Sequence, residues 1–142
     1  MVKGLLDTCV VSELLSPRGN PNVARSVQRI DDANLFLSVL TIGEITKGLH
    51  RLANGRRRTA IEFWLATVQS TYGERMLPVD AAVARMWGEL SARARSRGVA
   101  LPVTDGLIAA TALVQGLTVV TRNVKDFADT GVVLIDPWQD EA

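Results

Sequence analysis

Four acidic residues stand at the ends of apolar segments, where carboxylates could do chemistry. Asp7 ends the short apolar run "GLL", and Asp126 follows the apolar run "LTVVT". Glu44 and Asp105 fall in the first turns of predicted helices, within "SVLTIGEITKGL" and "PVTDGLIAATAL". Four carboxylates that converge on one cleft would repel one another and raise one another's pKa values. A divalent cation would remove that conflict.

The residue types around these acids indicate which ion they would bind. Cys9 is the single cysteine and His50 the single histidine, so no zinc-type spacing exists. An all-oxygen cluster selects a hard cation, and Mg²⁺ suits it, with Mn²⁺ as a possible substitute. Such a centre supports phosphodiester hydrolysis, because the metal lowers the pKa of a bound water and stabilises charge on phosphoryl oxygens. Nucleic acid is therefore the predicted substrate.

Each acid also has a structural explanation. Thr41 and Glu44 have the spacing of a capping box, in which a hydroxyl and a carboxylate satisfy backbone donors. Asp105 could complement the positive end of a helix, and Asp126 could hold an Asx turn. Asp7 is harder to explain in this way, because an acid at the end of a buried strand is costly without a partner.

The elements that must position the acids alternate along the chain. Short apolar segments predict strands at 2–6, 35–38, 76–79, 117–121 and 132–135. Helical spacing predicts helices at 8–15, 21–29, 41–52, 57–72, 102–115 and from 81 into the basic segment 93–97, with a turn at 123–127. Predicted boundaries include the caps Thr8, Asn20 and Asp80 and the helix stop Gly116.

The alternation of elements predicts a fold class and a place for the site. Strands that are apolar on both sides are typical of a parallel sheet covered on both faces, so we predict a three-layer α/β/α domain. In such sheets, ligands bind beyond the carboxyl ends of the strands. All four acids could therefore reach one edge of the sheet.

Composition narrows the class of protein. A chain of 142 residues with 47% hydrophobic content fits a single domain spanning 1–142. The 16 Lys and Arg balance 15 Asp and Glu, so net charge identifies no partner. The single cysteine favours a reducing, cytoplasmic setting. No apolar run approaches the roughly 18 residues of a membrane span, so we expect a soluble protein with no targeting segment and no membrane partner.

Basic residues gather outside the acids, at 51–58 ("RLANGRRR") and 93–97 ("RARSR"). Such groups could contact RNA phosphates and position the strand without reading its sequence. They could equally be ordinary solvated helix ends that complement the helix dipole.

Five segments in order, covering nearly the whole chain, resemble the PIN-domain ribonucleases: "LLDTCVVSELL", "LSVLTIGEITKGL", "LPVTDGLIAATAL", "LTVVTRNVKDF" and "VVLIDPW". The resemblance is to the VapC-type toxins of type II toxin–antitoxin systems, including the FitB-like subgroup. It implies a Rossmann-like parallel sheet, Mg²⁺-dependent endoribonuclease activity and a homodimer. It also implies a cognate VapB-type antitoxin, typically a small protein that covers the acidic cleft and can insert an Arg or Lys.

The same resemblance assigns roles to the acids. Asp7, Glu44 and Asp105 match the three core catalytic acids of the family, and Asp126 matches the fourth, more variable one. Asp7 and Asp105 are the implied direct metal ligands. One or two metal ions fit the sequence equally well.

Supporting residues are implied in the same way. Thr8 and Ser12 would orient the first acid or its waters, while Thr121 and Asn123 would support the far side of the site. The sequence departs from the family at Cys9, where an Asn is usual. A thiol is a weak hydrogen-bond partner, so the contact that the amide would make is the point of difference.

Two other functions are open at this stage. A phosphoryl-transfer α/β domain would use Asp7 as its nucleophile, but "DTC" lacks the second acid two residues later that such phosphatases use. A non-catalytic interaction module would use the acidic cleft to bind a basic protein partner. Cleavage of RNA in the presence of Mg²⁺, and its loss in chelator, would separate the nuclease from both.

Overall fold

The computed structural model describes residues 1–139 of the chain, and within them five strands form one sheet. Their spatial order is β3-β2-β1-β4-β5, and every neighbouring pair is parallel. The strands are β1 (Gly4–Leu6), β2 (Leu35–Ser38), β3 (Met76–Leu77), β4 (Thr118–Val120) and β5 (Leu134–Ile135). β3 and β5 are each two residues shorter than predicted.

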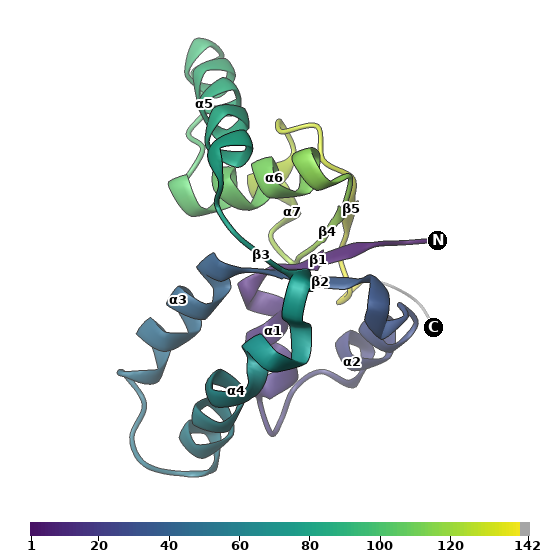
Figure 1. The fold of residues 1–142 in the computed structure, drawn as a ribbon, viewed down its shortest axis with the longest axis vertical. Coiled ribbons are helices and arrows are strands. Elements are labelled where there is room, and N and C mark those ends of the chain that lie inside the picture. Colours follow the sequence, from purple (N-terminus) through teal and green to yellow (C-terminus); the bar gives the residue numbers. More distant parts are fainter. Residues whose placement is uncertain (140–142) are drawn as a thin grey trace.

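Helices cover both faces of the sheet (Figure 1). One layer contains α1 (Thr8–Leu15), α2 (Pro21–Gln28), α3 (Val39–Leu49) and α4 (Arg56–Tyr72). The other contains α5 (Ala81–Ser96), α6 (Val103–Gln115) and α7 (Val124–Phe127). Short 3₁₀ turns, Asp32–Asn34 and Gly73–Arg75, precede β2 and β3. The predicted three-layer α/β/α architecture is confirmed.

The alternation of side chains along each strand divides the apolar residues between two cores. Leu6 and Val120 pack with the helices of the first layer, whereas their neighbours Leu5 and Val119 pack with the second. All four are at most 1% exposed. Successive side chains of a strand point to opposite faces, so a strand buried on both sides is apolar throughout. No helix in the part of the chain described here has the length and apolar character needed to cross a bilayer.

The order of the strands creates a crevice at one edge of the sheet. The chain builds outward from β1 through β2 to β3, then returns to place β4 on the other side of β1. Connections therefore leave β1 and β4 in opposite directions, which is the switch point where open α/β sheets bind ligands. Asp7 directly follows β1, and Thr121 directly follows β4.

Several predicted helix boundaries are confirmed. Asn20 caps α2 by accepting a hydrogen bond from the N–H of Asn22 at 2.9 Å. Asp80 caps α5 by accepting from the N–H of Val83 at 3.0 Å. α6 ends at Gly116, whose φ of 69° lies in the left-handed region that favours glycine.

Other predicted boundaries are wrong. Asp7, and not Thr8, is the N-cap of α1, so the acid itself starts the helix. α3 begins at residue 39 and not 41, because Ser38 caps it by accepting from the N–H of Leu40 at 3.1 Å. Thr41 and Glu44 therefore lie inside the helix, and the capping-box explanation of Glu44 is wrong. Residues predicted as a turn at 123–127 contain the short helix α7.

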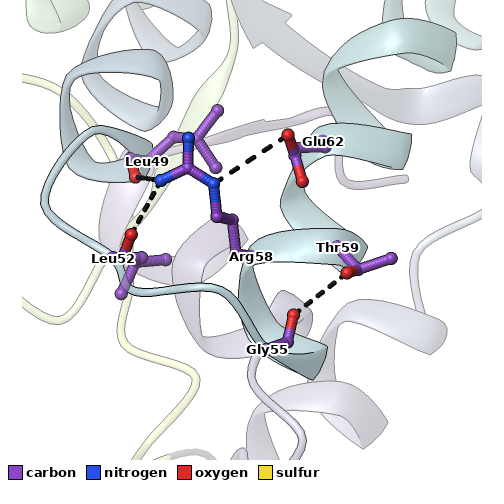
Figure 2. Close-up of polar contacts among 6 residues, drawn as sticks. All are labelled: Leu49, Leu52, Gly55, Arg58, Thr59 and Glu62. Carbon is purple, nitrogen blue, oxygen red and sulfur yellow. Dashed lines mark hydrogen bonds and ion pairs between the residues drawn. The ribbon is translucent and has the colours of Figure 1, made fainter.

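The end of α3 is closed by a side chain from α4 (Figure 2). Arg58 Nη1 donates to the carbonyl oxygens of Leu49 at 3.1 Å and Leu52 at 2.7 Å, and its Nε lies 3.9 Å from Glu62 Oε2. Carbonyl groups at a helix C-terminus lack hydrogen-bond donors within the helix. The guanidinium of Arg58 provides the missing donors. Arg58, one of the predicted RNA-contacting basic residues, is thereby engaged within the fold.

Candidate active site

Asp7 is a buried carboxylate with three hydrogen-bond donors around it. Only 5% of the residue is exposed. Its Oδ1 accepts from the N–H of Thr8 at 2.9 Å, and its Oδ2 accepts from Thr121 Oγ1 at 2.8 Å. The thiol of Cys9 donates to the same Oδ2 with an Sγ–O distance of 3.7 Å. These donors offset the cost of burying the charge and fix the carboxylate in one orientation.

Thr121 holds Asp7 from across the switch point of the sheet. The threonine is fully buried, and its N–H bonds to the carbonyl of Ile135 at 2.9 Å. Its Oγ1 accepts from the N–H of Asn123 at 3.0 Å. Because Asn123 supplies the proton that Oγ1 accepts, the hydroxyl proton of Thr121 is directed toward Asp7. The predicted supporting pair thus contacts Asp7 through one hydroxyl, while the side chain of Asn123 is exposed.

Thr8 links Glu44 to Asp7 by bonding to both carboxylates. Thr8 Oγ1 donates to Glu44 Oε1 at 2.5 Å, while the N–H of Thr8 bonds to Asp7. The hydroxyls of Thr8 and Thr41 are also 3.1 Å apart, and Thr41 is fully buried. Sequence reasoning missed this role of Thr41. Its spacing of three residues from Glu44, which places both on one helical face, was the available signal.

Asp105 and Asp126 approach the same edge from the other layer of helices. Asp105 lies in the first turn of α6, and Asp126 lies in α7. Burial first, and then the negative charges of Asp7, Asp126 and Glu44, raise the pKa of Asp105 from 3.8 to about 6. The four predicted acids therefore share one electrostatic environment at the carboxyl edge of the sheet.

The first turn of α6 is held against α5 by a close packing contact. A Cβ atom added at Gly106 would lie 2.9 Å from Cδ1 of Trp87 and 3.3 Å from Cδ2 of Leu101. Only a glycine next to Asp105 allows the indole ring this close. Trp87 packs against the core, and its buried Nε1 has no hydrogen-bond partner among residues 1–139.

The donor set suits a hard cation. Asp7, Glu44, Asp105 and Asp126 offer only oxygen, and burial raises the pKa of the nearby Cys9 thiol, which keeps it protonated. Within residues 1–139, no three Asp, Glu, His or Cys side chains gather closely enough to enclose a metal ion. Mg²⁺ does not need such a cage, because it keeps several waters and takes one or two carboxylates directly. The chemistry of these side chains therefore fits that ion.

Ser12, which was predicted to orient Asp7 or its waters, lies one turn after Thr8 on α1 and contacts Arg57. Its hydroxyl accepts from Arg57 Nη2 at 3.4 Å, and among the described residues the hydrogen bonds to the Asp7 carboxylate come from Thr8, Cys9 and Thr121. Ser12 and Arg57 line a small cavity of about 140 Å³ together with Thr8 and Glu44. Arg57 was predicted only as part of the basic cluster at 51–58.

The fold and its acidic edge together define a class of protein. We use acidic edge for the carboxyl edge of the sheet with Asp7, Glu44, Asp105 and Asp126. Residues 4–133 match the PIN-domain family, and the chain belongs to that family. The match spans every strand except the last, and it includes all four acids.

Particular members of the family resemble the chain over nearly its full length. Toxin FitB from Neisseria gonorrhoeae is 33% identical over 137 residues, which cover 96% of this chain and 99% of the relative. VapC ribonuclease Y4jK from Sinorhizobium fredii is 34% identical over 136 residues, covering 95% and 97%. The crystal structure of FitAcB from Neisseria gonorrhoeae superimposes with a TM-score of 0.87 at 32% identity, covering 96% of this chain and 99% of that chain.

Proposed function

We propose that this chain is a Mg²⁺-dependent endoribonuclease and the toxin of a toxin–antitoxin pair. One observation carries the proposal: the charges of Asp7, Glu44 and Asp126 all act on Asp105 at the switch point of a parallel sheet. Such a cluster of oxygen ligands supports metal-assisted hydrolysis of phosphodiester bonds. Membership of the PIN-domain family and the likeness to a protein named a VapC ribonuclease add support.

Asp7 and Asp105 are the proposed metal ligands, with Mn²⁺ as a substitute for Mg²⁺. Asp7 is held by Thr8 and Thr121, so its carboxylate is already oriented. Asp105 has a raised pKa, which marks an environment that a bound cation would relieve. When bound, the ion lowers the pKa of water and neutralises charge on the phosphoryl oxygens.

The other two acids complete the site from opposite sides. Glu44 is exposed while Thr8 fixes its Oε1, so the carboxylate is placed to orient the attacking water and accept a proton. Asp126 is exposed on α7 and adds negative charge beside Asp105. Both residues act on water and charge around the scissile phosphate, while Asp7 and Asp105 hold the ion.

A VapB-type antitoxin and a second copy of the chain are the proposed partners, in the cytoplasm. The support is the likeness to a protein named Toxin FitB and to the structure of FitAcB. A basic side chain of the antitoxin would compete with the metal for Asp7 and Asp105. Co-expression with a cognate VapB-type antitoxin should abolish RNA cleavage, and light scattering of the purified chain should give twice the monomer mass.

The nuclease proposal is tested by cleavage of a panel of structured and single-stranded RNAs. Wild-type protein should cut at least one RNA in Mg²⁺, and none in chelator. Asp7→Asn should abolish cleavage, because an amide cannot replace the carboxylate as a charged ligand. Asp31→Asn is the matched control, since Asp31 is an exposed acid before β2, at the opposite edge of the sheet.

Each outcome of this assay has a defined meaning. Cleavage that persists in chelator or in Asp7→Asn contradicts the metal-carboxylate mechanism. A wild-type protein that cuts no RNA on the panel favours the non-catalytic interaction module. Loss of cleavage in Asp31→Asn as well would mean that the loss in Asp7→Asn is not specific to the acidic edge.

A further inference from the structure

A groove runs along one side of α3 and begins at the bond between Thr8 and Glu44. Its volume is about 620 Å³. It is lined by Leu40, Gly43 and Lys47 of α3, by Arg51 in the turn after that helix, and by Thr104 of α6. We call it the α3 groove. Because Thr8 and Glu44 belong to both the groove and the acidic edge, whatever lies in the groove continues into the candidate active site.

The α3 groove carries two cations that the fold does not use. Lys47 and Arg51 are exposed, and neither pairs with an acid in residues 1–139. This separates them from Arg58, which closes the end of α3, and from Arg57, which contacts Ser12. Lys47 lies in the last turn of α3, and Arg51 lies in the turn just after the helix, where its N–H bonds to the carbonyl of Gly48 at 3.1 Å. The two cations therefore follow one another along the chain at the end of α3, and both line the same groove.

Gly43 keeps the floor of the groove open. It lies inside α3, where glycine weakens a helix, yet a Cβ atom added there would meet nothing within 4 Å. Packing against the protein therefore does not require the glycine. Its absent side chain instead leaves the helix backbone accessible from the groove, next to Glu44 and one turn before Lys47.

We propose that the α3 groove binds the backbone of single-stranded RNA, with Lys47 and Arg51 contacting phosphates on one side of the bond that is cut. This inference rests on the proposed function, since it needs RNA at the acidic edge. A basic groove that leads away from a catalytic cleft is how proteins track one nucleic acid strand. Phosphate contacts carry no sequence information, so these residues strengthen binding to every RNA alike.

The proposal is tested by measuring RNA affinity at several salt concentrations. A fluorescent single-stranded oligoribonucleotide is titrated with the Asp105→Asn protein, which should leave it intact, with and without Lys47→Gln/Arg51→Gln. Each lost contact to a single strand should lower the slope of log affinity against log salt by about 0.7, so the pair lowers it by about 1.4. Between 50 and 200 mM salt, the loss of affinity should then shrink by about sevenfold.

Two further variants distinguish the effect of contacts in the α3 groove from the effect of net charge on RNA affinity. Lys3→Gln/Arg18→Gln removes the same charge from two exposed residues, one before β1 and one after α1, at the ends of those elements away from Asp7, and its salt slope should equal that of the parent. Gly43→Leu changes no charge but fills the groove, so it should weaken binding at every salt concentration. Circular dichroism of each variant checks that the fold is retained.

The results also distinguish this inference from the proposed function. If wild-type protein cleaves RNA but Lys47→Gln/Arg51→Gln binds with the parent's affinity and slope, the groove assignment is overturned and the nuclease stands. An equal loss of slope in Lys3→Gln/Arg18→Gln also overturns it, because net charge would explain both. If wild-type protein neither binds nor cleaves any RNA, the proposed function fails and the groove assignment fails with it.

Discussion

Two threonines, Thr8 and Thr121, hold the carboxylates of the acidic edge through hydrogen bonds. Thr8 bonds to Asp7 through its N–H and to Glu44 through its hydroxyl, so one residue sets the relation of two acids. Thr121 bonds to Asp7 from the neighbouring strand. Cys9 adds a third and weaker donor to the same carboxylate, through its thiol.

Thr121→Val is expected to weaken both the fold and the site. The substitution keeps the shape of the side chain but removes the hydroxyl that donates to the buried carboxylate of Asp7. The free energy of unfolding, measured in urea with chelator present, should fall by about 1.5–3 kcal/mol, because the bond is to a charged acceptor. RNA cleavage should fall as well, and Thr121→Ser should restore both.

Thr111→Val is the matched control for that change. Thr111 is also fully buried, but its hydroxyl donates to the carbonyl of Leu107, a neutral group within the same helix, at 2.8 Å. Loss of this hydroxyl should lower the free energy of unfolding by less than about 1 kcal/mol. Equal costs at the two positions would show that Asp7 does not depend on the hydroxyl of Thr121.

Asp105→Asn is expected to stabilise the chain while removing its activity. The folded-state pKa of Asp105 is about 6 against an ordinary 3.8, so the folded chain binds this proton more tightly than the unfolded chain. Wild-type stability therefore falls as pH rises from 3.8 to 6, and the variant escapes that loss. At pH 7 in chelator the variant should be more stable by about 1 kcal/mol, a value reduced because solvent screens a part-exposed carboxyl.

The pH dependence is the specific signature of this effect. The advantage of Asp105→Asn in urea unfolding should shrink as pH falls below 6 and vanish below 3.8, where the carboxyl is protonated in both states. A variant that is less stable than wild type at pH 7, or whose advantage is the same at pH 4, would contradict the raised pKa.

At the scale of elements, the packing of α5 against α6 positions Asp105. Gly88 on α5 and Gly106 on α6 are both helical glycines, but only Gly106 has a close neighbour, Trp87. Gly88→Ala should raise the free energy of unfolding by about 0.5–1 kcal/mol and leave cleavage unchanged. Gly106→Ala should lower it by about 1–3 kcal/mol, because the indole must move, and should slow cleavage.

Thermal unfolding and cleavage rates of the two alanine variants check this prediction. Opposite signs of the stability change are expected from the same substitution in the same kind of element. A stable, fully active Gly106→Ala protein would show that the contact with Trp87 does not set the position of Asp105.

Most elements were predictable because their signals are local. Apolar runs at 4–6 and 118–120 and helical spacing in α3 and α6 depend only on neighbouring residues. The caps of α1 and α3 were mispredicted, because adjacent residues such as Asp7 and Thr8 can both cap a helix and the local sequence does not choose between them.

The contacts within the site were less predictable than the list of acids. Asp7 and Thr121 are 114 positions apart, and Thr8 and Glu44 are 36 apart, so these bonds exist only after the sheet has assembled. The acids themselves could be named because each follows a strand or opens a helix at the carboxyl edge. The free cations of the α3 groove, Lys47 and Arg51, could be told from the engaged Arg58 only in the structure.

At the scale of the whole molecule, the two helical layers meet at the acids. Asp7 caps α1 and Glu44 lies on α3, whereas Asp105 and Asp126 lie on α6 and α7. Figure 1 shows α1 and α3 in one layer of helices and α6 and α7 in the other. A cation held by Asp7 and Asp105 would therefore link the layers across the switch point. Burial first, and then repulsion by the other acids, raise the pKa of Asp105, and a bound cation would relieve the repulsion.

The central claim is that these carboxylates hold the metal ion that cleaves RNA, and a Mg²⁺ titration of the single-turnover cleavage rate tests it most directly. For wild type and the control Asp31→Asn, the rate should rise with Mg²⁺ and saturate on the same curve. For Asp105→Asn, the rate should stay near zero or require far more Mg²⁺. A wild-type rate that does not depend on Mg²⁺, or an Asp105→Asn curve that overlays that of wild type, would contradict the account.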